Sequence, residues 1–260
     1  MTNKHGDFIW YELLTSDADA ASDFYGKVIG WQAHNSEQPD MDYRMLAMDG
    51  EEAVAGLMAI NAEMKAGGAM PCWLGYVGVD DVDKMAASIA DGGGAVHMAP
   101  QDIPNVGRFA MVADPQGAMF YVMKGASDEA SLSFAYDMPR IGHCAWNELS
   151  TTDPENALHF YGTRFGWLKD GEMDMGSMGK YHFLRHSDGM IGAVMPKMPQ
   201  MPVSAWTYYF RVPDIDAAVA TIKTNGGTVL QEPMEIPGGD YSMSALDPQG
   251  AAFALVGARK

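Results

Sequence analysis

The chain has 260 residues, of which 47% are hydrophobic, and its formal net charge at pH 7 is −17. A chain of this length can bury one large core or two smaller ones, and its acidity argues against a nucleic-acid partner, because phosphate binding needs a basic face. There is no run of about 18 apolar residues and no apolar signal segment at the N-terminus, so we expect no membrane span and a cytoplasmic protein. The two cysteines, Cys72 and Cys144, have no metal-type spacing, which agrees with a reducing compartment.

The first predicted unit starts with WYELLTSDADAASDFYGKVIGW at residues 10–31. Its apolar, strand-like start is followed by Ser16 and Asp17, either of which can cap a helix, and Gly30 can close that helix. Two short extended runs, YRMLAM and AVAGLMAI, come next. This order predicts a strand, a helix and then further strands.

A second unit of the same kind begins with WLGYVGVDDVD at residues 73–83. Val82, Met85 and Ile89 recur at helical spacing, and the glycines that follow can end the helix. The extended runs RFAMVAD and AMFYVMK close the unit. Between them lies Asp-Pro-Gln-Gly, which has the residue preferences of a type I turn, so we interpret it as a structural turn into the last strand.

The second half of the chain repeats the first. WNELSTTDPENALHFYGTRFGW at 146–167 aligns without gaps with residues 10–31, and WTYYFRVPDID at 206–216 aligns with residues 73–83. The turn returns as well, because DPQGAMFYVM in the first half reappears as DPQGAAFALV near the C-terminus. Such self-similarity indicates a tandem duplication.

We therefore predict an α+β fold of four strand–helix–strand–strand–strand (βαβββ) modules. Two modules form a first domain at residues 1–126, and two form a second domain at residues 141–260. The intervening segment, residues 127–140, is polar at first and contains Pro139, as is typical of a linker. The repeat leaves open whether the modules pair within a half or across the two halves.

This arrangement resembles the vicinal oxygen chelate superfamily, the group of glyoxalase I, bleomycin-resistance proteins and extradiol dioxygenases. The resemblance covers nearly the whole chain and rests on the four modules, on Phe-Tyr-Gly and Gly-Trp around the end of a helix, and on Asp-Pro-Gln-Gly before the last strand. The starts ELLTSD and ELSTTD also resemble a two-domain, glyoxalase-like subgroup. The resemblance implies modules paired into two cupped sheets, each of which encloses a ligand cavity.

Metal-using members of that superfamily place one ligand, often His, on the opening strand of a module and another, often Glu, on the final strand. By this resemblance, the matching positions are Tyr11, Gly75, Asn147 and Tyr208 on the opening strands and Tyr121 and Ala254 on the final strands. None of these residues is a usual metal ligand. We therefore expect no metal cofactor, with a divalent metal at other positions as the alternative.

Two carboxylates stand next to these positions. Glu12 follows Tyr11 and Glu148 follows Asn147, so a register that differs by one residue would turn the carboxylates inward instead. A buried carboxylate needs a partner. We interpret each as an anchor between its strand and the neighbouring helix, and the rival role is that of a general base or an unconventional metal ligand.

His182 is a third catalytic candidate. Together with His186 it has the four-residue spacing of a helical metal pair. However, KYHFLRHSDG has the pattern of a strand that enters a turn. In an extended strand, residues four positions apart are too distant from each other to bind one metal ion. The pair therefore does not predict a metal site.

The remaining polar and aromatic side chains favour a pocket for a small molecule, because such pockets combine apolar walls with a few aimed polar groups. The ligand-binding candidates are Tyr11, Tyr121, Asn147, Tyr208, Arg44 and Arg108, and further wall candidates are Tyr43, Tyr181, His182 and Tyr241. We predict a glyoxalase- or bleomycin-resistance-like protein that binds a small molecule without the usual metal. The alternatives are an enzyme of the lyase, isomerase or dioxygenase type, with a metal or acid–base groups at non-standard positions, and an interaction protein that forms a homodimer.

Overall fold

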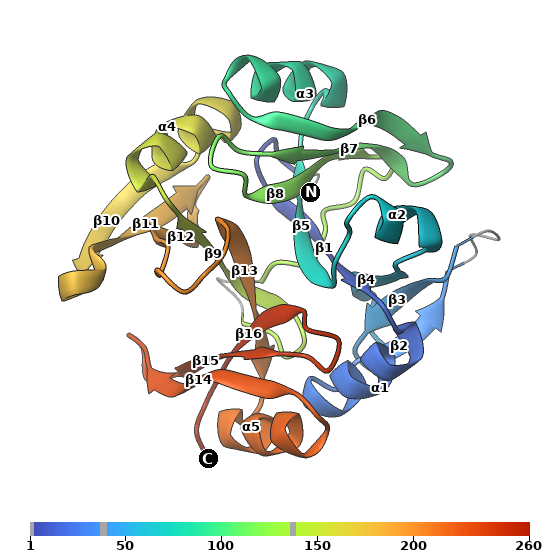
Figure 1. Ribbon diagram of the computed structural model, residues 1–260, viewed down its shortest axis with the longest axis vertical. Helices are drawn as coiled ribbons and strands as arrows, with labels where there is room; N and C mark the ends of the chain where they lie inside the picture. Colours follow the sequence, from blue (N-terminus) through green and yellow to red (C-terminus); the bar gives the residue numbers. More distant parts are fainter. Residues whose placement is uncertain (1–2, 37–40, 136–138) are drawn as a thin grey trace. The chain divides into compact units, whose positions relative to one another are not determined.

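The computed structural model describes residues 3–36, 41–135 and 139–260 (Figure 1). The elements of the first half are β1 (Phe8–Thr15), α1 (Ala18–Val28), β2 (Gln32–Asn35), β3 (Tyr43–Ala47), β4 (Ala53–Ala59), α2 (Ala62–Ala66), β5 (Cys72–Gly78), α3 (Val82–Asp91), β6 (Ala95–Ile103), β7 (Gly107–Ala113) and β8 (Met119–Gly125). Apart from the extra helix α2, these are two βαβββ modules.

The second half repeats the same order of elements. They are β9 (Cys144–Thr151), α4 (Pro154–Phe165), β10 (Leu168–Asp174), a short 3-10 helix (Gly176–Met178), β11 (Lys180–His186), β12 (Gly189–Pro196), β13 (Ala205–Val212), α5 (Ile215–Thr224), β14 (Thr228–Glu235), β15 (Tyr241–Leu246) and β16 (Ala252–Gly257). The predicted α+β fold of four tandem modules is confirmed.

An aspartate begins the main helix of every module. The side chains of Asp17, Asp81, Asp153 and Asp214 each accept a backbone N–H from the first turn of the helix that follows. These bonds satisfy donors that a helix leaves without an intrahelical partner. Of the two caps that the sequence allowed for α1, the structure uses Asp17, whose Oδ1 lies 3.0 Å from the N–H nitrogen of Ala20.

Within the described residues, the strands form two eight-stranded sheets with the same internal order. The first sheet has the order β2-β3-β4-β1-β5-β8-β7-β6, and the second has the order β10-β11-β12-β9-β13-β16-β15-β14. The opening strand of each module pairs in parallel with the last strand of that module, whereas the other ladders within a module are antiparallel. The main helices α1, α3, α4 and α5 each pack against strands of their own module (Figure 1).

Two compact units result, and each combines modules from both halves of the sequence. One unit contains residues 1–9, 75–131 and 146–207, and the other contains 10–74, 132–145 and 208–260. The sheets therefore follow the sequence halves, while the packing units join the second module to the third and the first module to the fourth. The domain bounds that the sequence indicated, at 1–126 and 141–260, stay a prediction.

The Asp-Pro-Gln-Gly turn is part of the core of each unit. The Oδ1 atom of Asp114 accepts the N–H groups of Gln116 and Ala118 at 2.9 and 2.8 Å, which closes the turn. Its Oδ2 atom accepts the hydroxyl of Tyr161 at 3.2 Å, and that hydroxyl accepts the indole N–H of Trp206 at 3.0 Å. Burial raises the pKa of the Asp114 carboxyl above its usual value, and the hydrogen bonds that it accepts oppose that rise.

The second unit repeats this arrangement with Asp247, Tyr25 and Trp73. The Tyr25 hydroxyl donates to Oδ2 of Asp247 at 3.1 Å and accepts the Trp73 indole N–H at 2.9 Å. In both units a tyrosine of Phe-Tyr-Gly is thus bonded to the turn aspartate from the opposite half of the sequence. The turn is structural, as predicted, and in addition it fastens one half of the chain to the other.

Candidate functional site

The face of β3 that is turned away from helix α1 carries an aromatic and acidic cluster. On the helix side, the Arg44 guanidinium donates to the carbonyl oxygen of Ala18 at 3.2 Å and to the hydroxyl of Ser22 at 3.1 Å, both in α1. Tyr43 precedes Arg44 on the strand, and successive side chains of a strand point to opposite faces. The Tyr43 side chain therefore lies on the face that α1 does not cover.

On this face, Trp10, Tyr43 and Glu12 form a chain of hydrogen bonds. The indole N–H of Trp10 donates to the Tyr43 hydroxyl at 2.9 Å. That hydroxyl is also hydrogen-bonded to the carboxylate of Glu12, and its pKa is raised well above the ordinary value by burial and by the negative charge of Glu12. Glu12 itself is only 3% exposed. We call Trp10, Glu12 and Tyr43 the first Trp–Tyr–Glu centre.

Gly56 makes room for this centre. It lies opposite Glu12 in the parallel pairing of β1 and β4. A Cβ atom at Gly56 would lie only 2.0 Å from the Tyr43 hydroxyl oxygen and 3.1 Å from the Trp10 indole nitrogen. Any larger residue at this position would displace the Tyr43 hydroxyl from its place beside Trp10.

Trp146, Tyr181 and Glu148 form the second Trp–Tyr–Glu centre. The Trp146 indole N–H donates to the Tyr181 hydroxyl at 2.8 Å, and that hydroxyl donates to Oε2 of Glu148 at 2.7 Å. All three side chains are half-buried, so Glu148 is more accessible than Glu12. The same bonding pattern thus occurs once in each half, on strands β1, β3 and β4 and on strands β9, β11 and β12.

A thiol lies beside the first centre. Burial, and next to it the negative charge of Glu12, raise the pKa of Cys72 to about 11. The thiol is therefore protonated at neutral pH, which makes it a poor nucleophile there. The aligned residue in the second half is Ala205, so the second centre has no such neighbour at this position.

Three predicted ligand-binding residues lie fully buried in the structure. Tyr11 packs its ring against Tyr208, with 5.1 Å between ring centroids, and both side chains are at most 1% exposed. Asn147 is likewise buried, and its amide N–H donates to the carbonyl oxygen of Ile191 at 2.7 Å. A role of these residues in ligand binding stays a prediction.

Tyr121 is buried as well, and its side chain lies on the same face of the sheet as that of Tyr76. The two rings stack with 4.2 Å between centroids and an interplanar angle of 20°, and Tyr121 is 1% exposed. Its counterpart Ala254 occupies the equivalent position on β16, opposite Tyr209. The duplicated strands therefore differ here in the size of one side chain.

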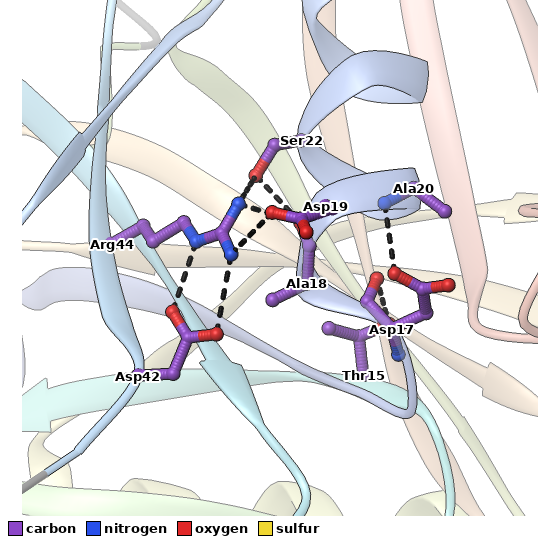
Figure 2. Close-up of polar contacts among 8 residues, drawn as sticks. All are labelled: Thr15, Asp17, Ala18, Asp19, Ala20, Ser22, Asp42 and Arg44. Atoms are coloured by element: carbon purple, nitrogen blue, oxygen red, sulfur yellow. Dashed lines mark hydrogen bonds and ion pairs between the residues drawn. The ribbon is translucent and has the colours of Figure 1, made fainter.

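Each of the two predicted arginines pairs with one carboxylate in the first turn of a helix and with one carboxylate outside the helices. Figure 2 shows Arg44 between Asp42 and Asp19, with N–O distances of 3.0 and 2.7 Å. Arg108 pairs with Asp83 at 2.7 Å and with Asp102 at 3.1 Å. Both arginines fasten a strand to a helix, and their role in ligand binding stays a prediction.

His182 lies next to Tyr181 on β11 and so points to the opposite face of the strand. It is 4% exposed, and its ring nitrogens lie 3.6 Å from the carboxylate of Glu172 and 3.8 Å from that of Glu155, on helix α4. Burial lowers the pKa of the imidazole from its usual value, and the positive charge of Lys169 adds to that effect. The structure does not bring His182 into the second Trp–Tyr–Glu centre.

The described residues do not fit the metal site that the resemblance implies. Among them, no group of three or more His, Cys, Asp and Glu side chains is close enough to hold a metal ion. The donors around Glu12 are the Tyr43 hydroxyl, which is bonded to Trp10 and Glu12, and the protonated Cys72 thiol. Glu12 is therefore the one ordinary metal ligand in this set, which lacks the imidazole and the further carboxylate ligands that divalent metals prefer.

The predictions named both glutamates but not the tryptophans. Trp10 and Glu12 align with Trp146 and Glu148, so the repeated W-x-E pattern was a usable signal. Tyr43 and Tyr181 were named only as candidates for the pocket wall, and no aligned pattern connected them with the glutamates, because the loops before β3 and β11 differ in length. The expected anchor for Glu12 and Glu148 was a neighbouring helix, whereas their tyrosine partners lie on strands β3 and β11 of the same sheets.

The fold of four duplicated modules defines a glyoxalase-like protein. The family model of the Glyoxalase/Bleomycin resistance protein/Dioxygenase superfamily matches residues 8–122 and 140–255, so the chain belongs to this superfamily. Among the described residues, no helix is long and apolar enough to cross a membrane.

Two curated relatives match almost the whole chain. "Putative glyoxylase CFP32" of Mycobacterium tuberculosis is 35% identical over 259 residues, which cover 97% of this chain and 95% of the relative. The anthracycline biosynthesis protein DauV of Streptomyces sp. strain C5 is 31% identical over 272 residues, which cover 96% of this chain and 93% of the relative.

Solved structures resemble the chain in fold. A Mn(II)-bound glyoxalase from Novosphingobium aromaticivorans superposes with a TM-score of 0.65 at 16% identity and covers 100% of this chain and 84% of its own. The 2,2',3-trihydroxybiphenyl 1,2-dioxygenase of Sphingomonas wittichii RW1 superposes with a TM-score of 0.66 at 14% identity, with coverages of 99% and 91%. At such identities the likeness concerns the fold alone.

Proposed function

We propose that this superfamily member binds a small molecule at its Trp–Tyr–Glu centres and does so without the usual metal. The observation that carries the proposal is the recurrence of one hydrogen-bonded constellation, Trp10–Tyr43–Glu12 and Trp146–Tyr181–Glu148, in both halves. Loops of different length lead to the two centres, yet the bonds are the same. The bonds are thus retained in both copies although the neighbouring loops differ, which supports a role beyond the packing of one strand.

The residue types favour a ligand with a flat apolar part and a hydrogen-bond donor or positive charge. An indole provides a broad apolar surface and attracts cations over its face. An ionised carboxylate only accepts hydrogen bonds, so it selects N–H and O–H groups. The net charge of −17 also raises the local concentration of cationic molecules. The name of the relative DauV links that protein to the biosynthesis of anthracyclines, which agrees with a small-molecule role.

Elemental analysis tests the metal-free part of the proposal. Protein purified without chelator is expected to contain much less than one Zn, Ni, Mn or Fe per chain. One firmly bound ion per chain would overturn this part of the proposal, and loss of that ion in Glu12→Gln or Glu148→Gln would place it at a centre.

Ligand binding is tested with a metabolite panel and thermal unfolding, because a ligand that binds the folded state raises the Tm. For a compound that binds at the centres, Glu12→Gln and Glu148→Gln are expected to weaken binding about tenfold or more, as the loss of a charged hydrogen-bond partner does. Glu63→Gln is the matched control, because it removes the same charge from the exposed surface of α2. Equal affinity in all three variants would contradict the proposal.

A second candidate function is acid–base catalysis at a centre. The observation that favours it is the pairing of a carboxylate with a tyrosine hydroxyl on a half-buried face, since such groups hold and move protons in enzymes. Turnover of a binding compound that is lost in Glu148→Gln, while the Kd changes much less, would identify this enzyme type. The predicted homodimer is tested by the mass of the protein in solution.

A further inference from the structure

The second Trp–Tyr–Glu centre has a further aromatic ring beside it. Phe183 follows Tyr181 by two residues on β11, so both side chains point to the same face of the strand. The centroid of the Phe183 ring lies 5.5 Å from that of Tyr181 at an interplanar angle of 71°, and 6.3 Å from that of Trp146 at 73°. We call Trp146, Tyr181 and Phe183 the three-ring group.

The strand register places Phe183 level with the carboxylate of this centre. Phe183 lies opposite Ala193 on β12, and Ala193 lies opposite Glu148 on β9. In this row, only a methyl group therefore stands between the ring and the carboxylate. On the other side of Phe183, Gly171 of β10 has no side chain, and a Cβ atom there would lie 3.8 Å from the ring. The small neighbours leave the ring and the carboxylate as the large side chains of the row.

The three-ring group and Glu148 are all half-buried. A cation gains most from an aromatic face when it is partly removed from water, but it must also be able to reach that face. Half-burial meets both conditions, whereas a fully buried group would meet only the first. The exposure of these four side chains thus agrees with a binding site for a small cation.

The charges around the three-ring group favour a cation as well. The Oε2 atom of Glu148 accepts the Tyr181 hydroxyl at 2.7 Å, which holds a carboxylate beside the rings. Arg185, the next basic residue along β11, is exposed and pairs with Asp170 at 2.7 Å, so its positive charge is balanced. The net charge of −17 attracts cations over a longer range.

The first centre has no ring at the equivalent position. Met45 lies opposite Gly56 on β4, and Gly56 lies opposite Glu12 on β1, so Met45 occupies the place that Phe183 has in the second half. In addition, Glu12 is only 3% exposed. The two centres share their hydrogen bonds, but of the two it is the second that combines three rings with an accessible carboxylate.

We infer that the second Trp–Tyr–Glu centre binds the methylated ammonium group of a small molecule and that Phe183 determines this specificity. The inference rests on the proposed function and names the ligand class of one of its two centres. Two perpendicular rings with centroids 6.3 Å apart share a position about 4.5 Å from both, within the roughly 6 Å range of a cation over a ring. The angle of 73° between the rings of Trp146 and Phe183 is close to this arrangement.

Methylation of the ammonium group follows from the kinds of side chain that are present. A primary ammonium group has three N–H donors, and each of them needs an acceptor when the group leaves water. Aromatic rings are poor acceptors, and the carboxylate of Glu148 already accepts the Tyr181 hydroxyl. A trimethylammonium group has no N–H donor, so its methyl groups pack against the rings while Glu148 balances its charge.

Choline and 3,3-dimethylbutan-1-ol test the inference, because the two molecules have the same shape and only choline is charged. Isothermal titration calorimetry of the full-length protein is expected to show that choline binds on the order of tenfold more tightly than the neutral alcohol. Glu148→Gln is expected to remove most of this preference. Glu12→Gln is expected to leave it unchanged, because the first centre lacks the third ring.

Phe183→Met tests the third ring, because it gives the second centre the residue that the first centre has. It is expected to weaken choline binding about threefold to tenfold, the effect of one lost contact between a cation and a ring, with little change for the neutral alcohol. Leu230→Met is the control, because it changes an exposed apolar side chain of β14. Urea unfolding curves show whether the variants fold, and the comparison of the two ligands on the unchanged protein depends on no variant.

Three outcomes would overturn the inference: no binding of choline, equal affinity for choline and the neutral alcohol, and unchanged choline binding in folded Phe183→Met. The proposed function fails separately. If choline did not bind but another compound of the metabolite panel bound and lost affinity in Glu148→Gln, the proposed function would stand and this ligand class would be rejected.

Discussion

The two Trp–Tyr–Glu centres have the same bonds but differ in their surroundings. In the first, Glu12 is 3% exposed, and its negative charge contributes to the raised pKa of the Cys72 thiol. In the second, Glu148 is half-buried, and alanine stands at the position that aligns with Cys72. After duplication, the hydrogen-bonding core of the centre was retained while its burial and neighbours diverged, so the second centre is the more accessible one.

The glycines beside the centres are expected to give the largest difference between the two halves. A Cβ atom at Gly192 would lie 1.8 Å from the backbone oxygen of Asn147, whereas a Cβ atom at Gly56 would meet the Tyr43 side chain. Backbone cannot move aside as a side chain can. We expect Gly192→Ala to lower the free energy of unfolding by about 3 kcal/mol and Gly56→Ala by about 1–2 kcal/mol.

Urea unfolding of both variants measures these effects. Gly125→Ala is the control, because nothing lies within 4 Å of a Cβ atom there. A larger loss for Gly56→Ala than for Gly192→Ala would show that the Tyr43 side chain is held more rigidly than the strand backbone, contrary to this comparison.

Removal of the tyrosine hydroxyls is expected to lower the free energy of unfolding by no more than Gly192→Ala does, and by more beside the buried Glu12 than beside the half-buried Glu148. Tyr43→Phe leaves the buried Glu12 and the Trp10 indole N–H without their shared partner, at a cost of about 1–3 kcal/mol. Tyr181→Phe is expected to cost about 0.5–1 kcal/mol, because water can replace the hydroxyl beside the half-buried Glu148.

The same urea series measures both tyrosine variants, and tryptophan fluorescence reports the change beside Trp10 and Trp146. Equal costs for the two substitutions would mean that water reaches both centres equally, which would remove the difference in burial as a distinction between them.

The smallest expected effect concerns the thiol that only the first centre has. With a pKa of about 11, Cys72 is thiolate in about one molecule in a thousand at pH 8, so alkylation by iodoacetamide is slow and accelerates as the pH rises toward 11. Glu12→Gln removes the charge that helps to raise this pKa. It is therefore expected to lower the pKa and to increase the alkylation rate at pH 8 severalfold.

Glu148→Gln serves as the matched control and is expected to leave the rate unchanged, and Cys144→Ala ensures that a single thiol is followed. An unchanged rate in Glu12→Gln would show that burial alone sets the Cys72 pKa, and the thiol would then no longer report on the first centre.

The sequence by itself determined the modules and their order, and it placed the helix caps to within one residue. Asp17, Asp81 and their two counterparts begin helices because the bonds of a cap join residues two or three positions apart. The alternation of strands likewise implied that Tyr11 and Glu12 face opposite ways. These features are local, so a single stretch of chain contains all the information that they require.

Only the tertiary structure decided which face of each strand is covered, and therefore which residues can form a site. Tyr11 packs into the core against Tyr208, and Glu12 meets Tyr43, although nothing near Glu12 in the sequence specifies that partner. The bond between Tyr25 and Asp247 spans most of the chain in the same way. Such contacts depend on how distant strands and helices pack, which the period of a strand cannot encode.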